Sequence, residues 1–416
     1  MSLIKFTLTL MSGSVIAQAI TFAAMPVLSR LYSPSDFGVF AFYMSTVSLL
    51  CIIASGRYEM AVVLPKKRTT ALNVLFLSLV VTSITCLLYL VLTLLFNKEI
   101  IRAIGPTTNS NWIFFIPFSV WLLNFYQTLS YWWTRKNSYK VQAISRIGKS
   151  GVNVVVNIAI VFSLGSLAGL GLVWSNVIAL LAALFILLQE FYRVERDWGR
   201  GVSLRRMLIL AVKYKNFPFL NSPHALINAL KEIMVNFIIL MKATGDALGA
   251  YYFMISVMRV PVGIVGSALA QVYYSEATSI YNSGRSIRKF TMKLLSILAL
   301  LGMIPAFLSY QFAQPVFIIV FGESWEIAGT YAKFITPYIY MHFIASPLGM
   351  VPLIVSRQKT ALLWGSLESV LFVAVFWFGL TIEEGMITTI KLLSIVFCFY
   401  FSIYFIWIFK ISGGSK

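Results

Sequence analysis

The segment 217–241 carries six polar residues in an otherwise apolar stretch, and their types could bind an ion or exchange a proton. They are Asn221, His224, Asn228, Lys231, Glu232 and Asn236. At about 100° per residue of an α-helix, all six lie within an arc of about 140°. Ionisable groups inside a membrane helix are costly and usually face the protein interior or a water-filled cavity. The alternative is structural: a Lys–Glu pair and Asn hydrogen bonds that join neighbouring helices.

A further charge, Arg259, lies in the middle of another apolar segment. Together with Lys231 it could form an electropositive site for a phosphate-bearing substrate, because basic side chains bind phosphate oxygens strongly. Snorkelling to the membrane surface or pairing with Glu232 is the alternative for Arg259. Glu232 could neutralise Lys231 or titrate in a proton-coupled cycle. Glu276 and Glu368 lie nearer the ends of predicted helices, where surface placement is the alternative.

The composition places these residues in a membrane protein. Of the 416 residues, 59% are hydrophobic and only 11% are charged, against about 25% charged in soluble domains. Helices suit such long apolar runs because backbone groups in lipid must be satisfied within the segment. Twelve segments are long and apolar enough to span a bilayer: 7–28, 38–56, 71–96, 112–132, 148–164, 167–190, 217–241, 249–270, 291–312, 331–353, 360–380 and 386–409.

The distribution of Lys and Arg orients the predicted spans. The connections after the even-numbered spans, together with the two tails, hold 25 of the 33 basic residues. The opposite connections hold four: Arg30, Lys98, Arg102 and Lys242. The positive-inside rule therefore places both termini in the cytoplasm. The net charge of +19 is then mainly a topology signal, and it argues against a nucleic-acid partner.

An internal repeat divides the chain into two halves. FGVFAFYMS at 37–45 aligns without gaps to LGAYYFMIS at 248–256, and each segment opens the second span of a six-span half. Because an even number of spans separates the copies, the halves share one orientation, as in parallel transporter repeats. Chance similarity of aromatic-rich segments is the alternative. We expect an all-α membrane fold with an N-terminal lobe (1–195), a basic cytoplasmic connector (196–216) and a C-terminal lobe (217–416).

The first span has a polar face like that of the seventh. Thr7, Ser14, Gln18 and Thr21 lie within an arc of about 60°. We expect the two faces to enclose a water-filled cleft between the lobes. The predicted cavity-lining or coupling residues are Gln18, Asn228, Glu232 and Asn236. After the first span, the turn LSRLYSPSDFGVF should place Asp36 at the start of the next helix, where an acid suits the dipole.

Several chemistries lack their residues in this sequence. It contains no phosphate-binding P-loop, no DxD carboxylate pair and no Cys/His metal cluster, and its three cysteines lie in apolar runs. We therefore predict no catalytic residue, no metal site and no cofactor. Energy would come from the substrate gradient or from coupling to a proton or sodium gradient.

Two longer motifs resemble a known family. SRLYSPSDFGVF followed by GRYEMAVVLPKK, and SVMRVPVGIVGSALAQVYYSEA in the second half, are similar to segments of Wzx-type oligosaccharide flippases. These form the polysaccharide transporter branch of the multidrug/oligosaccharidyl-lipid/polysaccharide (MOP) superfamily. The resemblance covers essentially the whole chain. It implies a multi-pass protein of the bacterial inner membrane that moves an undecaprenyl-pyrophosphate-linked O-antigen or related repeat unit by alternating access.

The resemblance also assigns candidate substrate-binding cations. Lys231 and Arg259 would hold the pyrophosphate, Arg57 would capture it from the cytoplasmic leaflet, and Arg30 would help release it outside. For Arg57 the alternative is a simple positive-inside signal. The implied partners are the lipid-linked oligosaccharide, the phospholipid bilayer, a polysaccharide polymerase and a chain-length regulator. The competing functions are export of drugs or peptidoglycan precursors by a related transporter, and O-unit polymerisation by a membrane enzyme.

Overall fold

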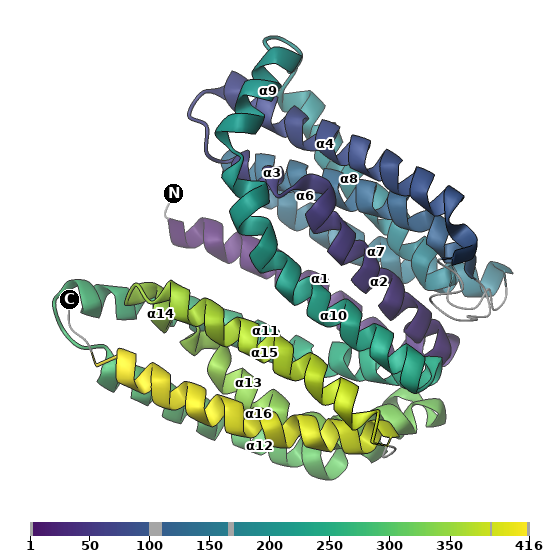
Figure 1. The fold of residues 1–416 in the computed structure, drawn as a ribbon, viewed down its shortest axis with the longest axis vertical. Coiled ribbons are helices and arrows are strands. Elements are labelled where there is room, and N and C mark those ends of the chain that lie inside the picture. Colours follow the sequence, from purple (N-terminus) through teal and green to yellow (C-terminus); the bar gives the residue numbers. More distant parts are fainter. Residues whose placement is uncertain (1–2, 100–109, 165–169, 383–384, 414–416) are drawn as a thin grey trace. The chain divides into compact units, whose positions relative to one another are not determined.

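The computed structural model describes residues 3–99, 110–164, 170–382 and 385–413 (Figure 1). Every regular element in these ranges is helical, and each of the twelve predicted spans coincides with one long helix. The all-α fold is therefore confirmed. The long helices are α1 (Leu3–Leu31), α2 (Pro34–Ser55), α4 (Arg68–Leu95), α6 (Ile116–Arg135), α7 (Tyr139–Leu164), α8 (Leu170–Val194), α10 (Ser222–Lys242), α11 (Gly245–Asn282), α12 (Arg288–Phe321), α13 (Glu326–Leu348), α15 (Gln358–Gly379) and α16 (Gly385–Ile411).

Short helices fill several of the connections. They are α3 (Tyr58–Ala61), η1 (Ser110–Phe115), α9 (Leu204–Lys213), η2 (Phe217–Asn221), η3 (Glu323–Trp325) and α14 (Val351–Ile354). Arg102 lies outside the described residues, as do the side chains of Thr7, Asn221 and His224. Eleven helices of the described chain are long and apolar enough to cross a membrane. The chain is thus a multi-pass membrane protein. The long helix not among the eleven is α10, in which the side chains at 223 and 224 lie outside the described residues.

Three helices run well beyond their predicted spans. Helices α11 and α12 continue to Asn282 and Phe321, beyond the expected ends at 270 and 312. The fifth span was expected at 148–164, but α7 begins at Tyr139. The added residues include Arg146, and Lys149 lies just inside the expected span. The charge count included both cations in the basic cytoplasmic connection, whereas α7 carries both as helical residues within a candidate span.

The helices form two compact units, Met1–Phe237 and Ile238–Lys416. This division falls within α10, whereas the sequence placed the lobe boundary before that helix, at 216/217. The predicted lobe boundaries remain a prediction.

The two units repeat the same packing pattern. In the first, α6 contacts α2, α4 and α8. In the second, α13 contacts α11, α12 and α16. In the predicted duplication, α2, α4, α6 and α8 are equivalent to α11, α12, α13 and α16. The contact between α7 and α8 likewise has its equivalent in the contact between α15 and α16. The fourth span of each half is therefore the central helix of its unit.

A buried aromatic pair recurs at the aligned positions. Phe42 of α2 lies edge-on to Trp112 of η1, with ring centroids 5.9 Å apart. Its aligned partner, Phe253 of α11, lies 4.0 Å from the ring of Trp325 in η3. Both tryptophans are almost completely buried in the short helix that precedes the central helix. Chance similarity of two sequence segments would not place both aligned phenylalanines against equivalent tryptophans, so this shared contact supports the duplication.

The helix caps repeat at the same offset of 211 residues. Ser33 caps α2 by accepting a hydrogen bond from the backbone N–H of Asp36 at 3.3 Å. Thr244 caps α11 by accepting one from the N–H of Ala247 at 3.0 Å. The Asp36 carboxylate in turn accepts from the N–H of Ser33 at 2.8 Å, which completes a capping box. The predicted capping role of Asp36 is confirmed.

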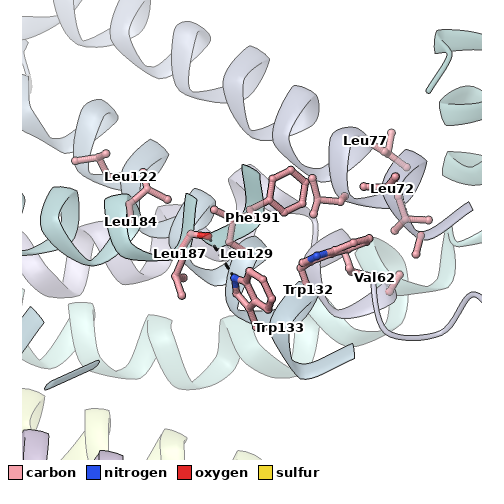
Figure 2. Packing of buried hydrophobic residues seen from close by; sticks show 14 of the residues in the cluster. Val62, Leu72, Leu77, Leu122, Leu129, Trp132, Trp133, Leu184, Leu187 and Phe191 are labelled. Atoms are coloured by element: carbon pink, nitrogen blue, oxygen red, sulfur yellow. Dashed lines mark hydrogen bonds between the residues drawn. The ribbon is translucent and has the colours of Figure 1, made fainter. Parts of the chain in front are cut away.

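The core of the first unit lies where α4, α6 and α8 pack together. Figure 2 shows Trp132 and Trp133 of α6 among leucines of the neighbouring helices. The indole N–H of Trp133 donates to the carbonyl of Leu187 at 3.4 Å, and Phe191 lies edge-on to Trp132. Close packing of this kind makes the unit a rigid support for the polar helices beside it.

A buried acid joins the ends of these helices. Glu195 follows α8 and is 1% exposed; it contacts Arg68 Nε at 2.5 Å and Lys136 Nζ at 2.6 Å. Burial alone would raise the pKa of Glu195, but the hydrogen bonds and charges of Lys136 and Arg68 outweigh it, so that its pKa is lowered. The carboxylate therefore stays ionised and holds the start of α4 to the ends of α6 and α8.

Candidate functional site

A polar stripe runs along α7 in the first unit. At about 100° per residue its members lie within an arc of about 100°. They are Gln142, Arg146, Lys149, Ser150, Asn153 and Asn157. Together with Ser14 and Thr21 of α1 they form what we call the α1–α7 polar seam. The α1–α7 pair is among the most extensive helix contacts of the unit.

Hydrogen bonds across the seam bring the two polar faces together. Arg146 donates from Nη1 to the hydroxyl of Ser14. The hydroxyl of Thr21 donates to that of Ser150 at 3.5 Å. Further along α7, Ser175 of α8 donates to the side-chain oxygen of Asn157 at 2.7 Å. The predicted polar face of α1 therefore meets a polar face of α7, a pairing that was not predicted from the sequence.

Both cations of the seam lie well inside the helix. Lys149 is ten residues beyond Tyr139, or about 15 Å along the axis, which is close to half of a hydrocarbon core of about 30 Å. Its ammonium lies 5.9 Å from the centre of the Tyr126 ring. Neither α1 nor α7 contains an Asp or Glu. Within the described part of the chain, neither Arg146 nor Lys149 forms an ion pair. An anionic ligand would supply the missing countercharge.

A glycine sets the separation of the two helices. A Cβ atom on Gly13 of α1 would lie 2.4 Å from the Cβ of Ala143 on α7. Only glycine permits this approach, because any side chain there would push the helices apart. Gly13 lies one residue before Ser14, so the close contact holds the hydroxyl of Ser14 within reach of Arg146.

A second charged feature lies in the turn after α2. Arg57 adopts a left-handed conformation (φ 60°) that is uncommon for non-glycine residues. Its Nη1 lies 3.8 Å from Oε1 of Glu59, which is buried. Burial raises the pKa of Glu59 above its ordinary value of 4.5, against the opposing effects of hydrogen bonding and of Arg57. Arg57 therefore offsets a buried acid, which is more than a positive-inside signal.

The second unit brings charged and aromatic groups together around Tyr338. The hydroxyl of Tyr338, on the central helix α13, hydrogen-bonds with Arg259 of α11 and lies within electrostatic range of Glu368. One turn further along α13, the ring of His342 lies 5.8 Å from that of Tyr338. Glu368 is the eleventh of 22 residues of α15, so its expected position near a helix end is wrong. This cluster holds both signs of charge, unlike the α1–α7 polar seam.

The predicted residues of α10 occupy different environments. Lys231 is half-buried, while Asn228 and Glu232 are exposed. Asn236 donates from Nδ2 to the backbone carbonyl of Ala41 at 3.3 Å, which joins α10 to α2. For Asn236 this contact favours the structural alternative. The predicted roles of Lys231, Asn228 and Glu232 remain predictions.

The other predicted residues are dispersed within their units. Arg30 is exposed in the last turn of α1. Gln18 is exposed on α1, near the hydrogen-bonded Thr21. Arg259 is exposed along part of its length and reaches Tyr338. The roles in substrate binding predicted for these side chains, and for Arg57, remain predictions.

Arg146, Lys149 and Glu59 were not among the site residues predicted from the sequence. The signal for the two cations was present, because their spacing from Ser150, Asn153 and Asn157 continues one helical face. The mean hydropathy of a segment does not reveal such a face, because it averages the polar and apolar sides of the helix. No sequence signal could have found the burial of Glu59, since its motif also contains Arg57 and is followed by Lys66 and Lys67.

Comparison with known proteins places these features in a family context. The family described as "Polysaccharide biosynthesis protein" matches residues 27–329. No curated protein matches the chain. The family match spans both segments on which the resemblance to oligosaccharide flippases was based.

Solved structures share the fold at low sequence identity. The lipid II flippase MurJ, in an inward closed conformation, has a TM-score of 0.69 at 13% identity, with 98% of this chain and 90% of that chain covered. An inward-facing multidrug resistance MATE family transporter of the MOP superfamily has a TM-score of 0.68 at 12% identity, with 96% of each chain covered. The MATE multidrug transporter DinF-BH has a TM-score of 0.66 at 11% identity, with 98% of this chain and 95% of that chain covered. These proteins are transporters and a flippase, not enzymes.

Proposed function

Because the chain belongs to the polysaccharide biosynthesis protein family and has the fold of MOP transporters, we propose that it is a flippase for a lipid-linked oligosaccharide. Its cargo is an undecaprenyl-pyrophosphate-linked repeat unit of O-antigen or a related surface polysaccharide. Alternating access moves that unit from the cytoplasmic to the periplasmic leaflet of the bacterial inner membrane. A polysaccharide polymerase and a chain-length regulator act on the delivered unit.

The observation that carries this proposal is the charge of the α1–α7 polar seam. Arg146 and Lys149 lie on one face of a candidate span, without an acidic partner among the described residues. A pyrophosphate group carries the charge and the oxygen acceptors that two such cations require. Arg146 can bind it with two parallel N–H groups, while Lys149 acts as a point charge. Lys231, Arg259, Arg57 and Arg30 keep their predicted roles in this proposal.

The sign of the charge separates this function from drug export. Export of a cationic drug requires acidic or aromatic contacts in the transport path. The α1–α7 polar seam offers two cations and no acid, which favours an anionic load. A peptidoglycan-precursor exporter would also carry an anionic load and stays the closest alternative.

Coupling to a proton or sodium gradient is part of the proposal. Glu232 was the predicted coupling residue, and Glu368 is a second candidate because it lies in the middle of α15 beside Tyr338. Transport into vesicles at imposed proton and sodium gradients, with Glu232→Gln and Glu368→Gln, would identify the ion and the residue.

The central test removes the two cations of the seam. In cells that lack their own copy of the gene, Arg146→Gln or Lys149→Gln should lower surface polysaccharide at least about tenfold, because losing a buried charge contact costs about 2–5 kcal/mol. Arg146→Lys should restore part of the activity. Purified wild-type protein should bind undecaprenyl pyrophosphate, and the two Gln variants should bind it more weakly. All three proteins should bind undecaprenol, which lacks the charge, equally.

The matched control is Lys140→Gln, which removes an exposed cation from the first turn of the same helix. It should leave surface polysaccharide unchanged. Equal amounts of each variant in the membrane exclude a folding defect. Normal polysaccharide and normal lipid binding in the Arg146→Gln/Lys149→Gln double variant would refute the anionic-load assignment.

A further inference from the structure

The connection between α8 and α10 contains a short helix whose apolar surface is divided. Helix α9 begins after Ser203, which caps it by accepting a hydrogen bond from the N–H of Arg206 at 3.4 Å. With ten residues it is about 15 Å long, too short to cross a bilayer. Figure 1 shows it beyond the α3 end of the first unit, beside α4.

One face of α9 is fixed to the protein. Met207 and Leu210 are buried, and α9 contacts α4. Asn73 of α4 accepts a hydrogen bond from the N–H of Ser203 at 3.0 Å and donates to the carbonyl of Gly201 at 2.9 Å. Asn73 is five residues into α4, about 8 Å from its start. The helix is therefore held near the end of a membrane span, at about the depth of lipid headgroups.

A different face of α9 is apolar and uncovered. Four large apolar side chains there are each at least 60% exposed: Leu204, Leu208, Ile209 and Val212. Leu204, Leu208 and Val212 follow one another at intervals of four residues and form a continuous stripe. The helix thus exposes more large apolar side chains than it buries, although it lies outside the predicted spans.

The charges around the stripe are mainly basic. Residues 193–215 include seven basic and two acidic side chains. Three of the basic residues, Arg205, Arg206 and Lys213, belong to α9 itself. Arg206 and Lys213 lie on the face opposite Leu204, and Arg205 lies beside Val212, where its long side chain can extend away from an apolar surface. All three are exposed. An apolar stripe bordered by Lys and Arg is the pattern of helices that lie in the surface of an anionic membrane.

We propose that α9 docks into the cytoplasmic leaflet, with Leu204, Leu208 and Val212 among the acyl chains and its basic residues on anionic headgroups. The surrounding charge selects this occupant, because an apolar protein partner would gain nothing from the flanking cations. The inference goes beyond the proposed flippase function and would hold for any load.

Docking would also fix the depth of a neighbouring turn. The hydroxyl of Tyr58 donates to the carbonyl of Ala211 in α9 at 3.1 Å. Tyr58 directly follows Arg57, which pairs with the buried Glu59. A lipid-anchored α9 therefore holds the Arg57 turn at a constant depth in the headgroup region.

Site-directed spin labelling of the full-length protein in vesicles tests the docking. Cysteines at Leu208→Cys and Val212→Cys, in a background where Cys398 is replaced by Ala, carry the label. Their accessibility to oxygen, which concentrates in the bilayer, should exceed that to a water-soluble nickel chelate. At Lys213→Cys the order should reverse. The labels at 208 and 212 should move deeper when neutral phosphatidylcholine vesicles receive about 30% phosphatidylglycerol.

A pair of charge variants isolates the contribution of the basic residues. Arg205→Gln/Arg206→Gln/Lys213→Gln should abolish the response of the Leu208→Cys label to phosphatidylglycerol. The matched control, Arg285→Gln/Lys289→Gln/Lys293→Gln, removes the same charge from positions elsewhere in the chain and should preserve that response. Monodisperse behaviour in detergent confirms that each variant is folded.

Three results would overturn the proposal. Equal access of the nickel chelate to positions 208 and 213 would mean that the stripe faces water. Exclusion of both reagents from position 208 would mean that protein covers it. A label depth that does not depend on phosphatidylglycerol would remove the anionic surface as its partner.

Discussion

The two compact units share a packing plan but differ in their charges. In both, a central helix contacts three equivalent neighbours, and a buried tryptophan in a short helix packs on an aligned phenylalanine. The first unit places Arg146 and Lys149 on a helix pair without acids. The second places Arg259 beside Tyr338, with Glu368 within electrostatic range.

The difference indicates which features a duplicated membrane fold must keep. Packing contacts and caps determine whether each half folds, so both halves retain them. The polar and charged residues of each unit contribute less to its packing, so their types can differ between the two halves. In our proposal the first unit binds the anionic load, whereas the second unit places Arg259, Tyr338 and Glu368 near one another.

The largest expected effect tests the shared packing. Trp112→Ala and Trp325→Ala should each lower the free energy of unfolding by about 3–5 kcal/mol, because each leaves a large cavity in a dense core. Unfolding in mixed micelles measures both. The exposed Phe185 and Phe399 provide controls, whose Ala variants should change stability by less than about 1 kcal/mol. A large effect of only one tryptophan would show that the two contacts are not equivalent.

The next prediction concerns a feature of the first unit alone. Gly13→Ala should destabilise by about 1–3 kcal/mol, because the new methyl group overlaps Ala143. It should also lower transport by separating Ser14 from Arg146. Gly151→Ala on α7 is the control, since a Cβ there meets no atom within 4 Å, and it should be neutral or stabilising by up to about 1 kcal/mol. Equal effects of the two changes would argue against a close helix approach.

A smaller effect is expected at the buried acid. Glu195→Gln should lower the free energy of unfolding by about 1–2 kcal/mol, a value reduced because Arg68 and Lys136 are partly exposed. The folded-state pKa is lowered from 4.5, so this stabilisation is present above pH 4.5 and is lost as the pH falls through the folded pKa. Denaturant titrations of wild type and variant between neutral and acidic pH should converge. Glu190→Gln, beside the exposed Arg193, is the control and should change stability by less than about 0.5 kcal/mol.

The smallest effect returns to the repeat. Ser33→Ala and Thr244→Ala should each cost about 1 kcal/mol, because each removes the cap of an equivalent helix. Ser33→Ala should cost slightly more, since it also removes the hydroxyl that donates to the Asp36 carboxylate. Matched denaturation curves measure the difference. A stabilising effect at either position would contradict its assignment as a cap.

Much of the fold could be predicted from the sequence. The twelve apolar segments all correspond to helices, and Asp36 caps α2 as expected. The aligned phenylalanines also occupy equivalent contacts. Less of the candidate site could be predicted, because Arg146 was assigned to a connection, Lys149 to the very start of a span and Glu368 to the end of a helix. Hydropathy averages around a helix, so it cannot reveal cations that share one face with small polar residues.

The sequence by itself determined the number and approximate limits of the spans, because burial in lipid requires long apolar helices with satisfied backbones. It also predicted the repeat, through aligned aromatic residues in the second span of each half. Only the tertiary structure decided which polar groups meet. Whether Arg146 contacts Ser14, Arg259 contacts Tyr338 or Arg57 contacts Glu59 depends on how helices distant in sequence pack, and local spacing carries no information about that packing.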